Sequence, residues 1–132
     1  MKIAADTNVL LRDVLQDDPI QSRLAGSALA NADLVVISTP VFCEFVWVLR
    51  HLYRKSGPEV ADAVRFLRDS ENVVTDRAAV DAGLAVLDAG GDFADGAIAY
   101  EGASMGAEEF VTFDKQAVKL LKSQGRRARL LS

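Results

Sequence analysis

Short runs of apolar residues alternate along the chain with longer stretches in which apolar residues recur every three or four positions. The short runs are typical of buried strands, and the longer stretches are typical of amphipathic helices. Strands are predicted at residues 2–5, 34–38, 72–75, 109–113 and 128–131. Helices are predicted at residues 8–16, 19–31, 40–55, 58–69, 76–89, 92–105 and 115–124.

Proline and glycine mark several of the predicted boundaries. Pro19, Pro40 and Pro58 lie near first helical turns, where a backbone N–H has no helical partner in any case. Gly90 and Gly106 follow predicted helices and tolerate the positive φ that ends a helix. Strands that alternate with helices imply right-handed crossovers, and hence a parallel sheet with helices on both faces. We found no linker or repeat, so residues 1–132 are expected to form a single three-layer α/β/α domain.

The composition of the 132 residues narrows the class of protein. Half of the residues are apolar and 26% are charged, which excludes a disordered chain. No apolar run reaches the roughly 18 residues that span a bilayer. The sequence turns polar by Asp6, so a secretory leader is not expected. The single cysteine, Cys43, cannot form an internal disulfide, and with one histidine, His51, it cannot build a zinc site; a cytoplasmic protein is therefore expected.

The segment 41–53 is apolar around most of its helical circumference. One apolar stripe begins at Val41 and another at Phe42, and Trp47 lies beside them. A helix that packs on one sheet needs only one such stripe. Either this helix is sandwiched in the core, or its outer stripe is a subunit or partner surface.

Four acidic residues stand out because of their positions. Asp6 and Asp114 each follow a predicted strand, at the sheet edge where α/β proteins form their sites. Glu44 is the one charged residue of an apolar stretch, in the first turn of a helix that also begins at the end of a strand. Asp95 shares a helix face with Asp92, three positions before it.

Each of these acids has a simpler interpretation when it is taken singly. Asp6, Asp92 or Asp114 could cap the helix that follows, and Glu44 could pair with a lysine or arginine. Four acids that converge on one sheet edge are harder to explain as caps. Carboxylates a few ångströms apart need protons or cations to compensate their repulsion. Because histidine and cysteine ligands are lacking, the oxygen donors favour Mg²⁺ or Mn²⁺.

Basic residues follow the last of these acids. The net charge of −4 (15 basic and 19 acidic residues) argues against a general nucleic-acid-binding surface, but not against a local one. A stripe with spacing 4, 3, 4 begins directly after Asp114, and another arginine lies in the helix after Asp6. The basic stripe could bind RNA, or it could be a solvated helix face. The candidate RNA-binding residues are Lys115, Lys119, Lys122, Arg126 and Arg12, with Arg127 and Arg129 extending the stripe.

Taken in order, these motifs resemble the PIN-domain ribonucleases. The resemblance rests on ADTN at 5–8, on Glu44, on DFADGAIA at 92–99 and on VTFD at 111–114, and it covers the whole chain. Length and spacing are most similar to the VapC toxins of VapBC toxin–antitoxin pairs. The family implies a parallel five-stranded sheet, a carboxylate cluster that binds Mg²⁺ or Mn²⁺, and endonucleolytic cleavage of RNA. It also implies a homodimer, inhibition by a VapB-like antitoxin in a heterotetramer or larger complex, and the cytoplasm of a bacterium or archaeon.

Carried over by position, the resemblance assigns roles to individual residues. The metal would be held by Asp6, Asp95 and Asp114 and would activate water for attack on a phosphodiester. Glu44 would complete the site directly or through a metal-bound water, and Asp92 is an auxiliary acid of some members. Asn8 and Thr112 match polar residues that orient the carboxylates. One mild departure is Tyr100, where many members have a small residue. Gly96, in the same predicted helix, lowers intrinsic helix stability by roughly 1 kcal/mol relative to alanine.

Other classes of protein account for fewer of these residues. A receiver-like regulatory domain would need adjacent acids after its first strand, where Asp6 stands alone, and a phosphoacceptor after its third. A phosphatase would need an acid two positions after its nucleophile, where Asn8 lies. A non-catalytic metal-binding module of the same fold is opposed only by the completeness of the four acids.

Overall fold

The computed structural model describes all 132 residues, which form two compact units, Met1–Asp76 and Arg77–Ser132. All five predicted strands and all seven predicted helices are present, and every strand pairing is parallel, which confirms the α/β class. Hydrogen bonds join the strands as a three-stranded sheet in the first unit and a two-stranded sheet in the second. The expectation of a single domain over 1–132 stays a prediction. None of the helices has the length and apolar character that crossing a membrane would require.

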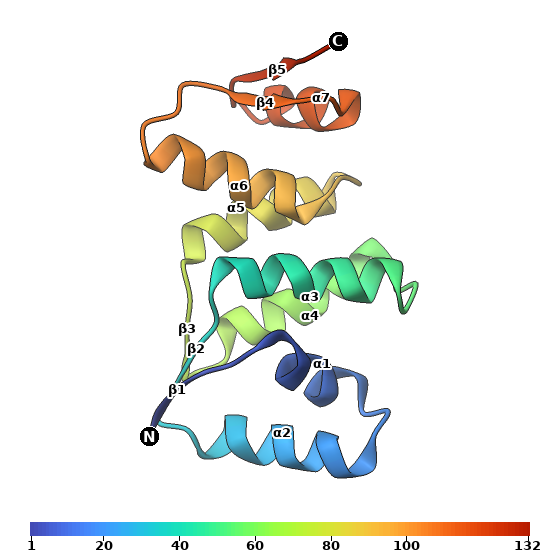
Figure 1. Cartoon of the computed structure of the whole chain (residues 1–132), viewed down its shortest axis with the longest axis vertical. Coiled ribbons are helices and arrows are strands. Elements are labelled where there is room, and N and C mark those ends of the chain that lie inside the picture. Colours follow the sequence, from blue (N-terminus) through green and yellow to red (C-terminus); the bar gives the residue numbers. More distant parts are fainter. The chain divides into compact units, whose positions relative to one another are not determined.

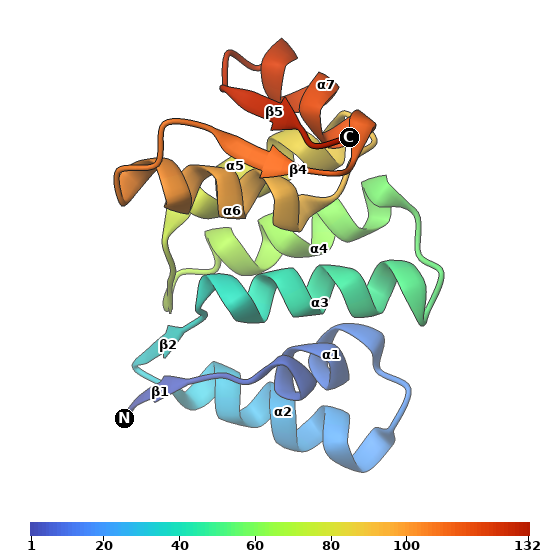
Figure 2. The same ribbon diagram turned by 45° about the horizontal axis from the view of Figure 1, so that its top comes forward.

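The first unit contains a sheet of order β1-β2-β3 in which Ile3 pairs with Val35, and Val35 with Val73. Side chains alternate along β2, so that Val35 is buried while Val36 is exposed. Helices α1–α4 extend to one side of these strands in both views (Figures 1 and 2). The elements are β1 (Lys2–Ala4), α1 (Thr7–Leu15), α2 (Pro19–Asn31), β2 (Leu34–Val36), α3 (Thr39–His51), α4 (Gly57–Asp69) and β3 (Val73–Val74).

Helix α3 is the most apolar helix of the first unit, and it packs against α1 and α4. Its inner face carries Phe42, Phe45 and Leu49, which are all buried. On its outer side the Trp47 side chain is 50% exposed and its ring stacks near that of His51, with the ring centroids 5.0 Å apart. The helix is therefore buried on one side only, and the interpretation that it is sandwiched in the core is wrong.

In the second unit, two helices pack side by side, and a pair of hydrogen-bonded parallel strands packs on a third helix. Phe110 pairs with Ala128, and a buried cluster of Val86, Val118, Leu121 and Ala128 joins α5, α7 and β5. Helices α5 and α6 lie next to each other in both views (Figures 1 and 2). The elements are α5 (Arg77–Asp88), α6 (Phe93–Ser104), β4 (Phe110–Thr112), α7 (Lys115–Ser123) and β5 (Ala128–Leu130).

Glycine permits the close contact between α5 and α6. A Cβ atom built on Gly96 would lie 2.2 Å from the carbonyl oxygen of Ala82, and one on Gly83 would lie 2.6 Å from the buried ring of Phe93. Side chains at these positions would push the two helices apart. The helix-weakening Gly96 is thus explained by packing, because only hydrogen fits between the backbones.

Candidate carboxylate site

Asp6 and Glu44 line one open pocket in the first unit. Because β1 and β2 are parallel neighbours, the chain leaves both strands at the same edge, and α1 and α3 begin close to it. The pocket has a volume of ≈ 240 Å³ and is lined by Asp6, Thr7, Asn8, Pro40, Val41 and Glu44. Glu44 is exposed and lies in the second turn of α3; its prediction in the first turn is wrong because α3 already begins at Thr39.

In the second unit, the charges of two acids act on a third. Asp92 precedes α6, Asp95 lies in its first turn, and Asp114 follows β4. Partial burial, together with the negative charges of Asp92 and Asp114, raises the pKa of Asp95 from its ordinary value of 3.8 to about 6. Asp95 is therefore a carboxylate that its surroundings keep from ionising easily unless a cation is present.

Three of the acids also act as helix caps. The Oδ1 atom of Asp6 accepts a hydrogen bond from the N–H of Val9 at 3.2 Å, and Oδ1 of Asp92 accepts one from Ala94 at 3.2 Å. Oδ1 of Asp114 accepts from Gln116 at 2.8 Å and also from Ala117. The capping interpretation is thus confirmed for all three, but each cap uses only one oxygen. The second oxygen of each carboxylate accepts no hydrogen bond from the protein and is free to bind a cation.

The residues expected to orient the carboxylates act less directly. Asn8 lines the same pocket as Asp6 and is exposed, but it donates no hydrogen bond to the Asp6 carboxylate. The Oγ1 atom of Thr112 accepts a hydrogen bond from the backbone N–H of Asp114 at 3.1 Å. Thr112 therefore fixes the backbone at the start of α7, and with it the position from which the Asp114 side chain extends.

Some of the basic side chains after Asp114 make an ion pair or a ring contact, and others make neither. Lys115, Lys119 and Lys122 are exposed on α7 and have no ion pair. Arg126 lies beyond the end of α7, and its guanidinium sits over the ring of Tyr100, 5.7 Å from the centroid. The exposed Arg129 side chain pairs with Glu109, at 2.7 Å from Nε to Oε1. The free basic surface of the stripe is therefore centred on the three lysines and on Arg127.

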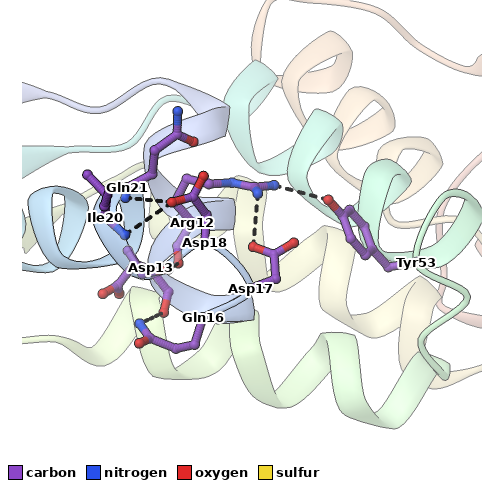
Figure 3. Close-up of polar contacts among 9 residues, drawn as sticks. Arg12, Asp13, Gln16, Asp17, Asp18, Ile20, Gln21 and Tyr53 are labelled. Atoms are coloured by element: carbon purple, nitrogen blue, oxygen red, sulfur yellow. Dashed lines mark hydrogen bonds and ion pairs between the residues drawn. The ribbon is translucent and has the colours of Figure 1, made fainter.

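Arg12, the other candidate for RNA binding, is engaged within the first unit. Its Nη1 atom lies 2.9 Å from Oδ1 of Asp17, and its Nη2 atom donates to the Tyr53 hydroxyl at 3.0 Å (Figure 3). The hydrogen bond to Tyr53 raises the pKa of the guanidinium above its usual range. No sequence signal identified Tyr53 as a partner, because the two residues are 41 positions apart.

The donor set fits a hard divalent cation. All five acids offer carboxylate oxygens and neither unit adds a histidine or cysteine to them, a combination that suits Mg²⁺ or Mn²⁺. No group of three or more Asp, Glu, His or Cys side chains is closely enough arranged to hold an ion as it stands. The structure brings Asp6 together with Glu44, and it brings Asp95 under the influence of Asp92 and Asp114. That all of them meet in one site stays a prediction.

In each unit a parallel strand is followed by an aspartate that caps the next helix. This arrangement defines a class of protein, an α/β domain with carboxylates at the carboxyl ends of its strands. A model of one such family, the PIN domain, matches residues 3–121, a span that contains all of the acids described above. The chain therefore belongs to the PIN domain family, and its helices and parallel strands are consistent with the three-layer fold of that family. PIN domains are typically metal-dependent nucleases that use Mg²⁺ or Mn²⁺. No curated protein matches the chain in a sequence comparison.

Proposed function

We propose that this PIN domain is a Mg²⁺- or Mn²⁺-dependent endoribonuclease that acts as the toxin of a type II toxin–antitoxin pair. The main observation behind the nuclease assignment is the raised pKa of Asp95. A partly buried acid whose pKa is raised to about 6, beside two further carboxylates, is an unfavourable arrangement unless a cation compensates it. Perturbed acids of this kind are characteristic of functional sites.

The ion would be held by Asp6, Glu44, Asp95 and Asp114, with Asp92 as an auxiliary ligand. A bound Mg²⁺ supplies Lewis-acid chemistry, which activates water and compensates negative charge on a phosphodiester. The protein contributes rigidity: the caps on Val9 and on Gln116 fix one oxygen of Asp6 and of Asp114, so that the other points in a defined direction. Desolvation of Asp95 strengthens its attraction to a cation.

The α7 lysines are proposed to bind the RNA backbone. Lys115, Lys119 and Lys122 follow Asp114 along one helix and carry no competing ion pair. Lysine contacts to phosphates are sequence-independent and depend steeply on salt. Arg126 and Arg12 contribute less in this scheme, because Arg126 is stacked on Tyr100 and Arg12 is held by Asp17 and Tyr53.

A VapB-like antitoxin and a second copy of the chain are the proposed protein partners, in a heterotetramer or larger complex in the cytoplasm of a bacterium or archaeon. Support for a protein partner comes from large apolar side chains that the first unit leaves at its surface. An amphipathic helix of an antitoxin could bury such side chains. The most exposed of them on the helices and at the end of α3 are Ile20, Leu24, Trp47, Leu52 and Phe66.

Cleavage of total bacterial RNA by the purified full chain, freed of any bound peptide, tests the nuclease assignment. Wild-type protein with Mg²⁺ should produce discrete fragments, and EDTA should abolish them. Asp6→Asn should be inactive yet folded, because asparagine caps a helix as well as aspartate does. Cleavage by Asp6→Asn would refute the assignment. Tight Mn²⁺ binding without any cleavage would instead favour a non-catalytic metal-binding module.

A second measurement asks whether the acids of the two units serve the same ion. Mn²⁺ binding would be followed by titration calorimetry for the wild type, Asp6→Asn, Asp95→Asn and Asp62→Asn. Asp62 is an exposed aspartate on α4 and is the matched control. Both site variants should weaken the same binding event, whereas Asp62→Asn should leave it unchanged. Two independent events, each lost with only one variant, would contradict a shared site.

A further inference from the structure

Arg12 connects the ends of three helices in the first unit. Its guanidinium contacts Asp17, next to the start of α2, and the hydroxyl of Tyr53, just beyond the end of α3. Its backbone carbonyl accepts a hydrogen bond from the hydroxyl of the buried Ser22 at 2.8 Å. Figure 3 shows the guanidinium spanning from α1 to Tyr53, with Asp17 below it. The Arg12 side chain is 21% exposed, whereas its partners Asp17 and Tyr53 lie at the surface.

The same two helices, α1 and α3, carry the acids of the first unit at their other ends. Asp6 caps the beginning of α1, and Glu44 lies in the second turn of α3. The two helices pack against each other. At one end they share the pocket with Asp6 and Glu44, and at the other they share the Arg12–Tyr53 hydrogen bond.

A small movement of α1 at Arg12 would displace Asp6 in the pocket. Arg12 lies six positions after Asp6, which is about 9 Å along a helix axis. A tilt of about 5° at the Arg12 end would therefore move the Asp6 end by roughly 0.8 Å. Metal and catalytic sites tolerate displacements of only about 0.5 Å.

We propose that Arg12 and Tyr53 are positioning residues, whose contact fixes the angle between α1 and α3 and so the separation of the Asp6 and Glu44 carboxylates. Asp17 holds the guanidinium in the orientation that reaches Tyr53. The expected effect on cation affinity rests on the proposed function, whereas the expected effect on the angle between the helices does not. This role differs from the phosphate-binding role that the sequence predicts for Arg12.

Tyr53→Phe is the sharpest perturbation, because it removes the hydroxyl and keeps the ring. Tyr100→Phe is the matched control, since Tyr100 meets Arg126 through its ring face. Asp18→Ala is the second control: it removes the α2 cap, in which Asp18 accepts from Ile20 and Gln21, and it changes neither partner of the Arg12–Tyr53 hydrogen bond. Both controls keep the proposed connection between α1 and α3.

The first readout is amide hydrogen exchange of the full chain without metal. Tyr53→Phe should speed exchange at the distant ends of both helices, at residues 9–11 and 42–45, and the controls should not. Faster exchange confined to residues 12–19 and 50–57 would overturn the proposal, because the contact would then be only a local support. This readout does not depend on any nuclease activity.

The second readout is Mn²⁺ affinity, measured beside the melting temperature. Tyr53→Phe should weaken binding by about tenfold, the lower end of what is lost when residues supporting metal ligands are removed. Asp18→Ala should lower the melting temperature and leave Mn²⁺ affinity unchanged. Unchanged affinity in Tyr53→Phe would overturn the positioning role. If the wild type bound no Mn²⁺, the proposed metal site would fail, and the exchange pattern would still decide whether the contact fixes the two helices.

Discussion

Replacing Asp95 by asparagine should make the protein more stable and inactive at the same time. The pKa of Asp95 is raised from 3.8 to about 6, mainly by burial. A pKa difference of about 2 corresponds to about 3 kcal/mol, and because Asp95 is only partly buried, solvent screening reduces the effect to about 1 kcal/mol. The folded state holds the proton more tightly than the unfolded chain, so the stability contributed by Asp95 is greatest below pH 4 and is lost as pH rises through 6. Asparagine does not ionise and avoids this loss.

Urea unfolding between pH 4 and pH 8, without divalent ions, measures the effect. Asp95→Asn and wild type should be equally stable near pH 4, and the variant should be about 1 kcal/mol more stable above pH 7, or about 4 °C higher in melting temperature. Saturating Mg²⁺ should reverse the order, because it stabilises only the wild type. Asp62→Asn should follow the wild type throughout. A variant that is less stable at pH 8, or a difference that does not change with pH, would refute the account of Asp95.

Two other regions of the chain give predictions, one on stability and one on RNA binding. Gly96→Ala should destabilise the chain by about 1–3 kcal/mol, since the new Cβ would meet the Ala82 carbonyl oxygen at 2.2 Å. Helix propensity alone predicts a gain in stability of about 1 kcal/mol. The sign of the stability change in urea unfolding therefore decides between packing and propensity. Replacing two exposed α7 lysines, Lys119→Gln with Lys122→Gln, should weaken RNA binding. It should also reduce the steepness with which the logarithm of the RNA-binding constant falls with the logarithm of salt concentration, by about 1.4. An unchanged slope, measured by fluorescence anisotropy, would show that these lysines do not contact RNA.

Local signals predicted the elements well, and they failed where a distant contact decides the structure. The bounds of α2 follow from Pro19 at its start and match the structure, because capping acts within a few residues. Helix α3 was expected to continue to residue 55, but it ends at His51. The apolar pattern continues past that point through Leu52 and Tyr53, and no helical periodicity reveals that the Tyr53 hydroxyl contacts Arg12.

The candidate site shows the same division. Acids at strand ends could be found from the sequence because strand and helix boundaries are local features. The pKa of Asp95 could not, since it depends on burial and on the Asp114 charge from another segment. The sequence also left Asp6, Asp92 and Asp114 as either caps or ligands, whereas the structure shows that a cap occupies only one oxygen.

The proposed function gives these carboxylates a second use beside the capping of helices, and this has an evolutionary consequence. A lineage that loses its chemistry can still retain its helices if aspartate changes to asparagine, a change of a single base, because asparagine keeps the cap on α1, α6 or α7. Alanine at the same positions would cost about 1 kcal/mol of stability for each cap lost. Inactive descendants of this protein should therefore carry asparagine where Asp6 and Asp114 stand, and such a pair would mark a fold preserved after its reaction was abandoned.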